Sequence, residues 1–295
     1  MIINQYDEKG LKDGLWVQRN DEGKLLSCAN YKNGKLDGKY IEYNPISGLI
    51  TSSSEYKEGL LHGNSKIYDL EGNLQINMEY KNNLKDGICL NYSSNGNLKR
   101  IINYSEDKQH GREIDFYENG QVRTNTNFEK GKKHGLEISY YPDGSIEKKA
   151  NFKNGNLHGR TEQFYENGKL KEISNYNNRE PHGISLSFYE NGELNYMTSF
   201  NNGNVNRLFL HFNENGSFKD FFLVKDGNRD FSLSDKEKKE LIDKESENLF
   251  KETQKDDYLK EIIKNTSWGK AQGNTTAQEW GNKILEDKIS DLERE

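Results

Sequence analysis

Histidine is the residue type in this sequence with the clearest capacity for chemistry, because its imidazole binds metals and titrates near neutral pH. Five of the six histidines precede a glycine at a regular interval: His62, His110, His134, His158 and His182. On strands two apart, neighbouring members would lie about 10 Å from each other, whereas zinc holds its ligands at about 2 Å. Elsewhere the same position holds Asp13, Asp37, Asp86 and Asn206, residues that hydrogen-bond locally in turns. We therefore interpret the column as turn residues and predict no metal site.

The candidate nucleophiles also lack the partners that catalysis requires. Cys28, Cys89 and the serines at 52–54 and 93–94 show no accompanying base in a recognisable motif. Glycine pairs occur without the strand-to-helix context of a phosphate-binding loop. We predict no catalytic residue, no cofactor and no enzymatic activity. The two cysteines occupy non-equivalent positions, which favours reduced thiols in a reducing compartment.

The glycines instead mark an internal repeat. One column comprises Gly14, Gly38, Gly63, Gly87, Gly111, Gly135, Gly159 and Gly183. A second comprises Gly23, Gly48, Gly72, Gly96, Gly120, Gly144, Gly168, Gly192 and Gly216. The step is 24 residues except for one step of 25 in each column, which places an extra residue near 44–47. A fixed period of this length indicates a repeat array.

Each repeat shows the period of two that is typical of strands with one buried face. Ile184, Leu186 and Phe188 alternate after one glycine of the first column. After the second-column glycine, the second, sixth and eighth positions are mostly apolar or small, as in Leu170, Ser174 and Tyr176. We predict that these three positions form one core.

Two kinds of turn separate the strands. Glu-Asn-Gly at 118–120, 166–168 and 190–192 has the residues that a tight hairpin needs. The other connection, as at 153–159, carries two glycines and suggests a longer, looser turn. Since all connections are short, consecutive strands should be antiparallel neighbours.

The glycine and aromatic spacing, including Tyr-Glu-Asn-Gly at 165–168, resembles the MORN repeat, specifically the bacterial variant of YwqK-type antitoxin proteins. The resemblance covers residues 1–230 and implies an elongated antiparallel sheet of about nine stacked 24-residue β-hairpin repeats. We place this array at 1–231 and a C-terminal α-helical segment, which the resemblance does not cover, at 232–295. Asn83, Asp107 and Arg179 depart from the pattern by replacing a turn glycine, so altered turns are expected there.

The C-terminal segment shows helix signals. Residues 234–237 form a capping box, and two apolar stripes follow with an expected break near 254–257. We predict a loop at 268–274 and a last helix that carries Trp280. These helices either cover the final edge of the array or bind a partner, with Trp268 and Trp280 as anchors.

Composition narrows the possible partners. The net charge of −6, from 42 basic and 48 acidic residues, is unlike that of a nucleic-acid-binding protein. It also makes an anionic membrane surface an unfavourable partner. The first residues lack a secretory signal, and no stretch reaches the length of a membrane span. We expect a cytoplasmic protein.

Four tyrosines suggest a binding surface. Tyr117, Tyr141, Tyr165 and Tyr189 each follow an inward-facing aromatic position, so they should face the opposite way. The first four repeats have Asn20, Asn44, Asp69 and Ser93 there instead. Because every repeat meets the same stacking problem, this contrast indicates a partner-binding face in the later repeats. Alternatively, the tyrosines pack over neighbouring strands and shield the backbone.

Two functions fit these features. The resemblance implies a non-catalytic protein-binding protein, most concretely an immunity protein or antitoxin that binds a cognate toxin and occludes its active site. The alternative, from the wider MORN resemblance, is a structural scaffold or a membrane or phosphoinositide adaptor. The sequence leaves the oligomeric state open.

Overall fold

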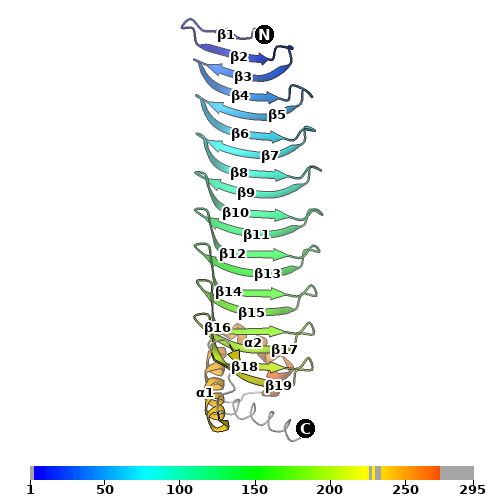
Figure 1. Ribbon diagram of the computed structural model, residues 1–295, viewed down its shortest axis with the longest axis vertical. Helices are drawn as coiled ribbons and strands as arrows, with labels where there is room; N and C mark the ends of the chain where they lie inside the picture. The colour runs from blue at the N-terminus through cyan, green and yellow to red at the C-terminus, as the bar shows by residue number, and fades with distance from the viewer. Residues whose placement is uncertain (1–2, 226–227, 230–233, 273–295) are drawn as a thin grey trace. The chain divides into compact units, whose positions relative to one another are not determined.

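The computed structural model describes residues 3–225, 228–229 and 234–272. Successive antiparallel strands make up most of these residues, and a short helical segment follows them (Figure 1). The chain divides into two compact units. Unit 1 contains Met1–Gly135 and Pro142–Gly144, and unit 2 contains Leu136–Tyr141 and Ser145–Glu295.

In both units, strands that are consecutive in the sequence pair as hairpins. The strands of unit 1 are β1 (Gln5–Tyr6), β2 (Lys12–Arg19), β3 (Leu25–Lys32), β4 (Lys35–Tyr43), β5 (Ile50–Lys57), β6 (Leu60–Tyr68), β7 (Leu74–Lys81), β8 (Leu84–Tyr92), β9 (Leu98–Ser105), β10 (Lys108–Phe116) and β11 (Val122–Glu129). The boundary between the units falls within β12 (Lys132–Tyr140). Unit 2 continues with β13 (Ile146–Lys153), β14 (Asn156–Phe164), β15 (Leu170–Asn177), β16 (Glu180–Phe188), β17 (Leu194–Asn201), β18 (Asn204–Phe212), β19 (Phe218–Lys225) and β20 (Asn228–Arg229). The pairs from β2–β3 to β18–β19 correspond to the predicted repeats, which confirms the mainly-β hairpin-repeat fold class.

The two turn types are the reverse of the prediction. Only Asn154 and Gly155 lie between β13 and β14, and both have positive φ, 54° and 86°. Two consecutive left-handed residues are what a two-residue hairpin turn requires. By contrast, residues 165–169 separate β14 from β15, and there only Gly168 has positive φ, 79°. The Glu-Asn-Gly turn is therefore the longer one.

The residues that replace a turn glycine keep the regular turn, so the expectation of altered turns is wrong. Asn83, Asp107 and Arg179 have φ values of 70°, 63° and 77°. The Asn83 side chain accepts a hydrogen bond from the backbone N–H of Leu61 at 2.7 Å. Asp107 accepts one from Lys85 at 2.8 Å. These bonds reach the preceding repeat, and Asn and Asp are residues that tolerate the left-handed conformation.

A β-bulge near the longer turn separates the predicted core positions onto two faces. In β16–β17, Ser187 pairs with Tyr196 but Phe188 pairs with Leu194, so one residue of β17 has no partner. An extra residue reverses the alternation of side chains. Leu194, at the second position, therefore points to the other face of the sheet from Thr198 and Phe200, which occupy the sixth and eighth positions. The prediction of one shared core is wrong for this reason.

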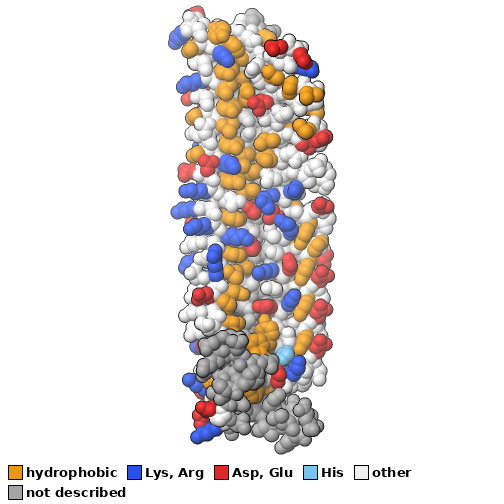
Figure 2. All heavy atoms as spheres, in the orientation of Figure 1, with side chains coloured by type: hydrophobic (Ala, Val, Ile, Leu, Met, Phe, Trp, Pro, Cys, Tyr) orange, Lys and Arg blue, Asp and Glu red, His pale blue; other side chains and the backbone are white. Residues whose placement is uncertain are grey.

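We call the two surfaces face A and face B. Face A carries the residues of the second position and those in register with Leu186 and Met197. Face B carries the residues of the sixth and eighth positions and those in register with Ser185. On face B the sixth position is the most buried: Ala150 is 1% exposed and Thr198 is fully buried. The Thr198 hydroxyl donates to the Leu208 carbonyl at 2.9 Å. Residues of the eighth position are half-buried, and hydrophobic side chains gather in a stripe across the strands (Figure 2).

Three helices follow the strands of unit 2: α1 (Asp235–Gln254), α2 (Asp257–Asn265) and α3 (Ser267–Gln272). The predicted capping box is present at Ser234 and Glu237, and α1 and α2 meet at the predicted break. The loop predicted from 268 is wrong up to Gln272, because these residues form α3. The Thr266 hydroxyl accepts the Gly269 N–H at 3.0 Å and caps this helix.

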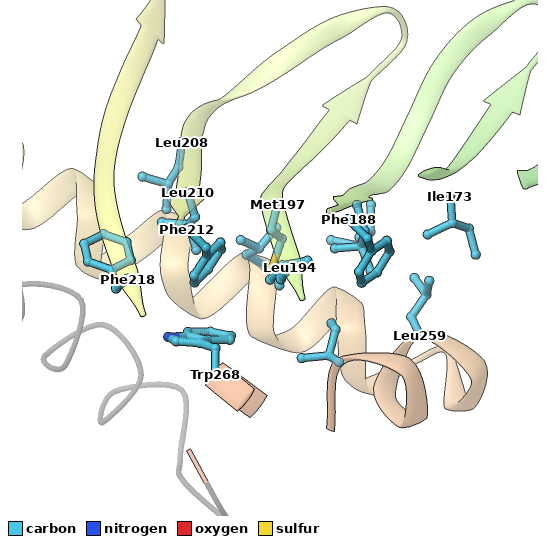
Figure 3. Packing of buried hydrophobic residues seen from close by; sticks show 14 of the residues in the cluster. Ile173, Phe188, Leu194, Met197, Leu208, Leu210, Phe212, Phe218, Leu259 and Trp268 are labelled. Atoms are coloured by element: carbon cyan, nitrogen blue, oxygen red, sulfur yellow. The ribbon is translucent and has the colours of Figure 1, made fainter. Parts of the chain in front are cut away.

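The described helices pack on face A of the last repeats (Figure 3), and cover of the final edge by the segment stays a prediction. Trp268 is 4% exposed, and its ring lies edge-on to Phe212 with 4.9 Å between centroids. Buried residues from both layers form one cluster: Ile173, Ile184, Leu186, Phe188, Leu194, Met197, Leu208, Leu210, Phe212, Phe218, Leu223, Ile242, Leu249, Leu259, Ile263 and Trp268. The predicted domain boundary after Phe231 falls outside the described residues.

Replacement of Trp268 by alanine tests this packing. Removal of the buried indole should lower the free energy of unfolding by about 3–5 kcal/mol, through lost burial and the cavity left behind. Denaturant titrations of the wild-type and variant proteins, followed by intrinsic fluorescence and circular dichroism, measure the change. Lys270→Ala on the exposed side of α3 is the matched control, with an expected change within about 0.5 kcal/mol. Equal effects of the two substitutions would contradict the docked position of Trp268.

Candidate functional site

The longer turns of unit 2 place Tyr141, Tyr165 and Tyr189 at equivalent positions in successive repeats. Each is the first residue after a strand, and its backbone N–H closes the turn. The Tyr165 N–H donates to the Lys169 carbonyl at 2.9 Å. All three side chains are half-buried.

Each of these tyrosines binds the backbone of the next repeat. The hydroxyls of Tyr141, Tyr165 and Tyr189 donate to the carbonyls of Phe164, Phe188 and Phe212 at 2.8, 2.7 and 2.8 Å. A parallel set of bonds joins the turns themselves, since Asn167 Nδ2 donates to the Glu190 carbonyl at 3.1 Å. These tyrosines therefore link neighbouring repeats, in line with the alternative interpretation that they pack over neighbouring strands.

Tyr117 occupies the same position in unit 1. Its N–H donates to the Gln121 carbonyl at 2.8 Å, and its own carbonyl accepts the Gly120 N–H at 3.0 Å. The side chain is half-buried. Tyr117 thus forms the same turn as the tyrosines of unit 2.

The earlier repeats stabilise this turn differently. Asn20 Oδ1 accepts the backbone N–H of Glu22 at 3.1 Å and of Lys24 at 2.8 Å. Where tyrosine replaces this residue, an asparagine two positions later takes over, and Asn167 Oδ1 accepts the Lys169 N–H at 2.9 Å. The uneven distribution of tyrosine therefore has a structural reason. The argument that a structural role would favour one residue in every repeat is wrong.

A hollow of about 410 Å³ lies beside two of the tyrosines. It is lined by Tyr141, Tyr165, Glu166, Asn167, Lys171 and Glu190. Lys171 Nζ lies 5.5 Å from the centre of the Tyr165 ring. Acidic side chains recur beside hydrophobic ones along the edge formed by the longer turns (Figure 2).

Two carboxylates and one lysine give the lining of the hollow a net negative charge. Burial, and then the negative charge of Glu190, raise the pKa of Tyr165. Burial and Glu214 raise the pKa of Tyr189 in the same way. Both hydroxyls therefore stay protonated donors at neutral pH. Carboxylates and aromatic faces together suit lysine or arginine side chains.

Of the two tryptophans predicted as anchors, the structure describes only Trp268. Trp268 is buried between the helices and face A, so its ring offers no free surface and we leave it out of the candidate site. Trp280 lies outside the described residues. A binding role for either one stays a prediction.

Sequence reasoning missed the polar contacts that hold the helices. Arg160 of β14 pairs with Asp256, and its guanidinium lies 4.6 Å from the centre of the Tyr258 ring. At the turn after β16, the Ser267 N–H donates to Glu193 at 2.8 Å. No local sequence pattern predicts these contacts, because the two residues of each pair are far apart in the sequence.

Within residues 3–225, 228–229 and 234–272, no three His, Cys, Asp or Glu side chains come close enough to hold a metal ion. Two members of the histidine column have local neighbours instead. His62 Nδ1 lies 3.3 Å from Asn82 Oδ1, and His134 Nδ1 lies 3.5 Å from a Glu129 carboxylate oxygen. Of the described helices, none is both long and apolar enough to cross a membrane.

Fold and turns together define a β-hairpin repeat protein. The family model described as a MORN repeat variant matches the chain in seven segments, at residues 12–33, 61–82, 85–106, 109–130, 133–154, 157–178 and 181–202. These segments make up just over half of the chain, so the chain belongs to the MORN repeat variant family. The family indicates a repeat protein of the protein- or lipid-binding type. The β4–β5 hairpin has the same structure without a match, and its turn contains the extra residue.

Comparison with solved structures gives only distant likenesses. A TcdB2-TccC3 structure without its hypervariable C-terminal region is 11% identical over 70% of this chain and 14% of its own, with a TM-score of 0.22. The Tc holotoxin pore of Photorhabdus luminescens is 14% identical over 72% and 13%, with a TM-score of 0.20. A porin-like protein from Bacteroides uniformis is 10% identical over 73% and 86%, with a TM-score of 0.19. This chain thus spans only a small part of the first two of these chains. Among curated proteins, none matches the chain.

Replacement of Tyr165 by phenylalanine tests the bonds between repeats. Loss of the hydroxyl leaves the Phe188 carbonyl without this donor and should lower the free energy of unfolding by about 0.5–1.5 kcal/mol. Tyr68→Phe, on a half-buried ring of unit 1, should change it by less than about 0.5 kcal/mol. Urea titrations of the three proteins provide the comparison. An unchanged Tyr165→Phe variant would show that this bond does not stabilise the array.

Proposed function

We propose that this chain is a non-catalytic protein-binding protein of the cytoplasm, and specifically an immunity protein or antitoxin that occludes the active site of a cognate toxin. The observation that carries the proposal is the turn surface of unit 2. There, tyrosines held in place by the backbone border a hollow whose rim carries Glu166 and Glu190.

Fixed tyrosines make an effective binding surface. The hydroxyls of Tyr141 and Tyr165 are already bonded to backbone carbonyls, so these rings lose little conformational freedom when a partner binds. Tyrosine is enriched in protein interfaces because it combines a large apolar ring with a polar tip. The rings are half-buried, so part of each side chain lies at the surface.

Charge supports a basic protein as the partner. The net charge of −6 and the carboxylates at the hollow attract a positively charged surface and speed association. A toxin that acts on nucleic acid would present such a surface around its active site. The resemblance of the turn motif at 165–168 to YwqK-type antitoxins supports the immunity role. The same charge makes an anionic lipid surface the less favourable partner of this class.

Coexpression with the product of the adjacent gene tests the proposal. The chain should restore growth of cells that express this product and should form a complex with it. Glu166→Lys with Glu190→Lys should weaken the complex at least tenfold, about 1.4 kcal/mol, mainly through slower association. Asp21→Lys with Glu22→Lys, in the corresponding turn of the first repeat, is the matched control and should have little effect. Absence of both rescue and binding, or binding only to anionic vesicles, would overturn the proposal.

A further inference from the structure

The central row of face A contains two apolar segments in unit 1: Val17, Cys28 and Ile41 on β2–β4, and a second one on β8–β10. Residues in register across neighbouring strands define this row from β5 to β11: Ser53, Lys66, Asn77, Leu90, Ile101, Ile114 and Asn125. Three consecutive members, Leu90, Ile101 and Ile114, are apolar, whereas the residues before and after them are polar. Ile88 extends this segment along β8. We call these four residues the apolar island.

The corresponding row of unit 2 shows what such a segment binds. There the row reads Ile173, Leu186, Met197, Leu210 and Phe221. The amphipathic helices of the same unit cover it, and Ile173, Leu186 and Met197 are fully buried. In unit 2 the apolar part of face A is therefore the surface on which the helices pack.

The apolar island has no such cover among the described residues of unit 1. Ile88 is 43% exposed, and Leu90, Ile101 and Ile114 are half-buried. Isolated exposed apolar residues are common on protein surfaces, but four on adjacent strands of one face are typical of an interaction site.

A basic residue, Arg112, lies beside the island and indicates that a helix bound there would carry acidic residues. Arg112 lies two repeats before Arg160, and the two have the same backbone environment: Asn103 Nδ2 donates to the Arg112 carbonyl at 2.7 Å and Asn151 Nδ2 to the Arg160 carbonyl at 3.0 Å. Arg160 binds Asp256 at the start of α2 and lies against the ring of Tyr258. In unit 2 this repeat position, Arg160, contacts an acidic and an aromatic residue. Arg112 occupies the equivalent position next to the island and is exposed.

We propose that the apolar island and Arg112 bind an acidic amphipathic helix of a partner protein. The helix buries an apolar stripe against Ile88, Leu90, Ile101 and Ile114, and a carboxylate near one of its ends pairs with Arg112. Lys66, further along the same row, favours additional acidic residues on that helix. This surface lies in unit 1 and is separate from the tyrosine-lined surface of unit 2, so either proposal can fail without the other.

The helical segment of this chain supplies the probe. A labelled synthetic peptide of residues 234–265, which contains α1 and α2, is titrated into the full-length protein. It should bind saturably. Arg112→Glu should weaken binding at least tenfold, and a peptide with Asp256→Arg should restore the affinity of this variant to within threefold. Lys108→Glu, an equal charge change on the same strand, is the matched control and should change the affinity less than twofold.

Three results would overturn the proposal. The first is no binding of the peptide to the wild-type protein. The second is binding that does not respond to Arg112→Glu but is lost with Arg160→Glu, because the peptide then exchanges with the helices of unit 2. The third is failure of the charge-reversed peptide to restore binding while circular dichroism shows the Arg112→Glu protein to be folded.

Discussion

Hydrogen bonds from side chains of one repeat to the backbone of the next are the interaction on which this structure depends. A two-stranded hairpin buries too little surface to be stable alone, so each repeat relies on its neighbours. The Tyr165 hydroxyl and the Asn167 amide both reach the following repeat, to Phe188 and Glu190. In the first repeats, where Asn20 closes its own turn, this tyrosine bond is absent. The residue that starts each longer turn therefore determines whether a side-chain bond of this kind is added to the strand pairing between repeats.

The β-bulge is the second constraint, because it gives the sheet two chemically different faces. Face B collects small side chains such as Ala150 and Thr198, which are buried, whereas Ser54 at the same position is half-buried. Face A receives the leucines and aromatics that precede or follow the bulge, and in unit 2, where its central row is also apolar, it binds the helices. The tyrosine-lined hollow in unit 2 lies at the longer turns, whereas the apolar island in unit 1 lies on face A. One array can in this way present separate surfaces to separate partners.

Much of the fold follows from the sequence, since period, alternation and the capping box at Ser234 are local signals. The errors arose where one residue changes the geometry. A single bulged residue moved Leu194 to the opposite face, and two successive positive φ values at Asn154 and Gly155 made the apparently loose turn the tight one. The candidate tyrosines were located correctly as a row, but their backbone partners were invisible to periodicity. The docking of the helices rests on pairs such as Arg160 and Asp256, which no local pattern connects.

The central claim is that face A is a surface for helices, and that its C-terminal part is occupied by the helices of the chain itself. Hydrogen–deuterium exchange of the wild-type protein, read by peptide mass spectrometry, tests this claim most directly. If it is correct, amides of α1 and α2 exchange slowly and are protected to the same degree as those of β15–β19. Exchange of α1 and α2 at the rate of an unstructured peptide, while β15–β19 remain protected, would contradict it.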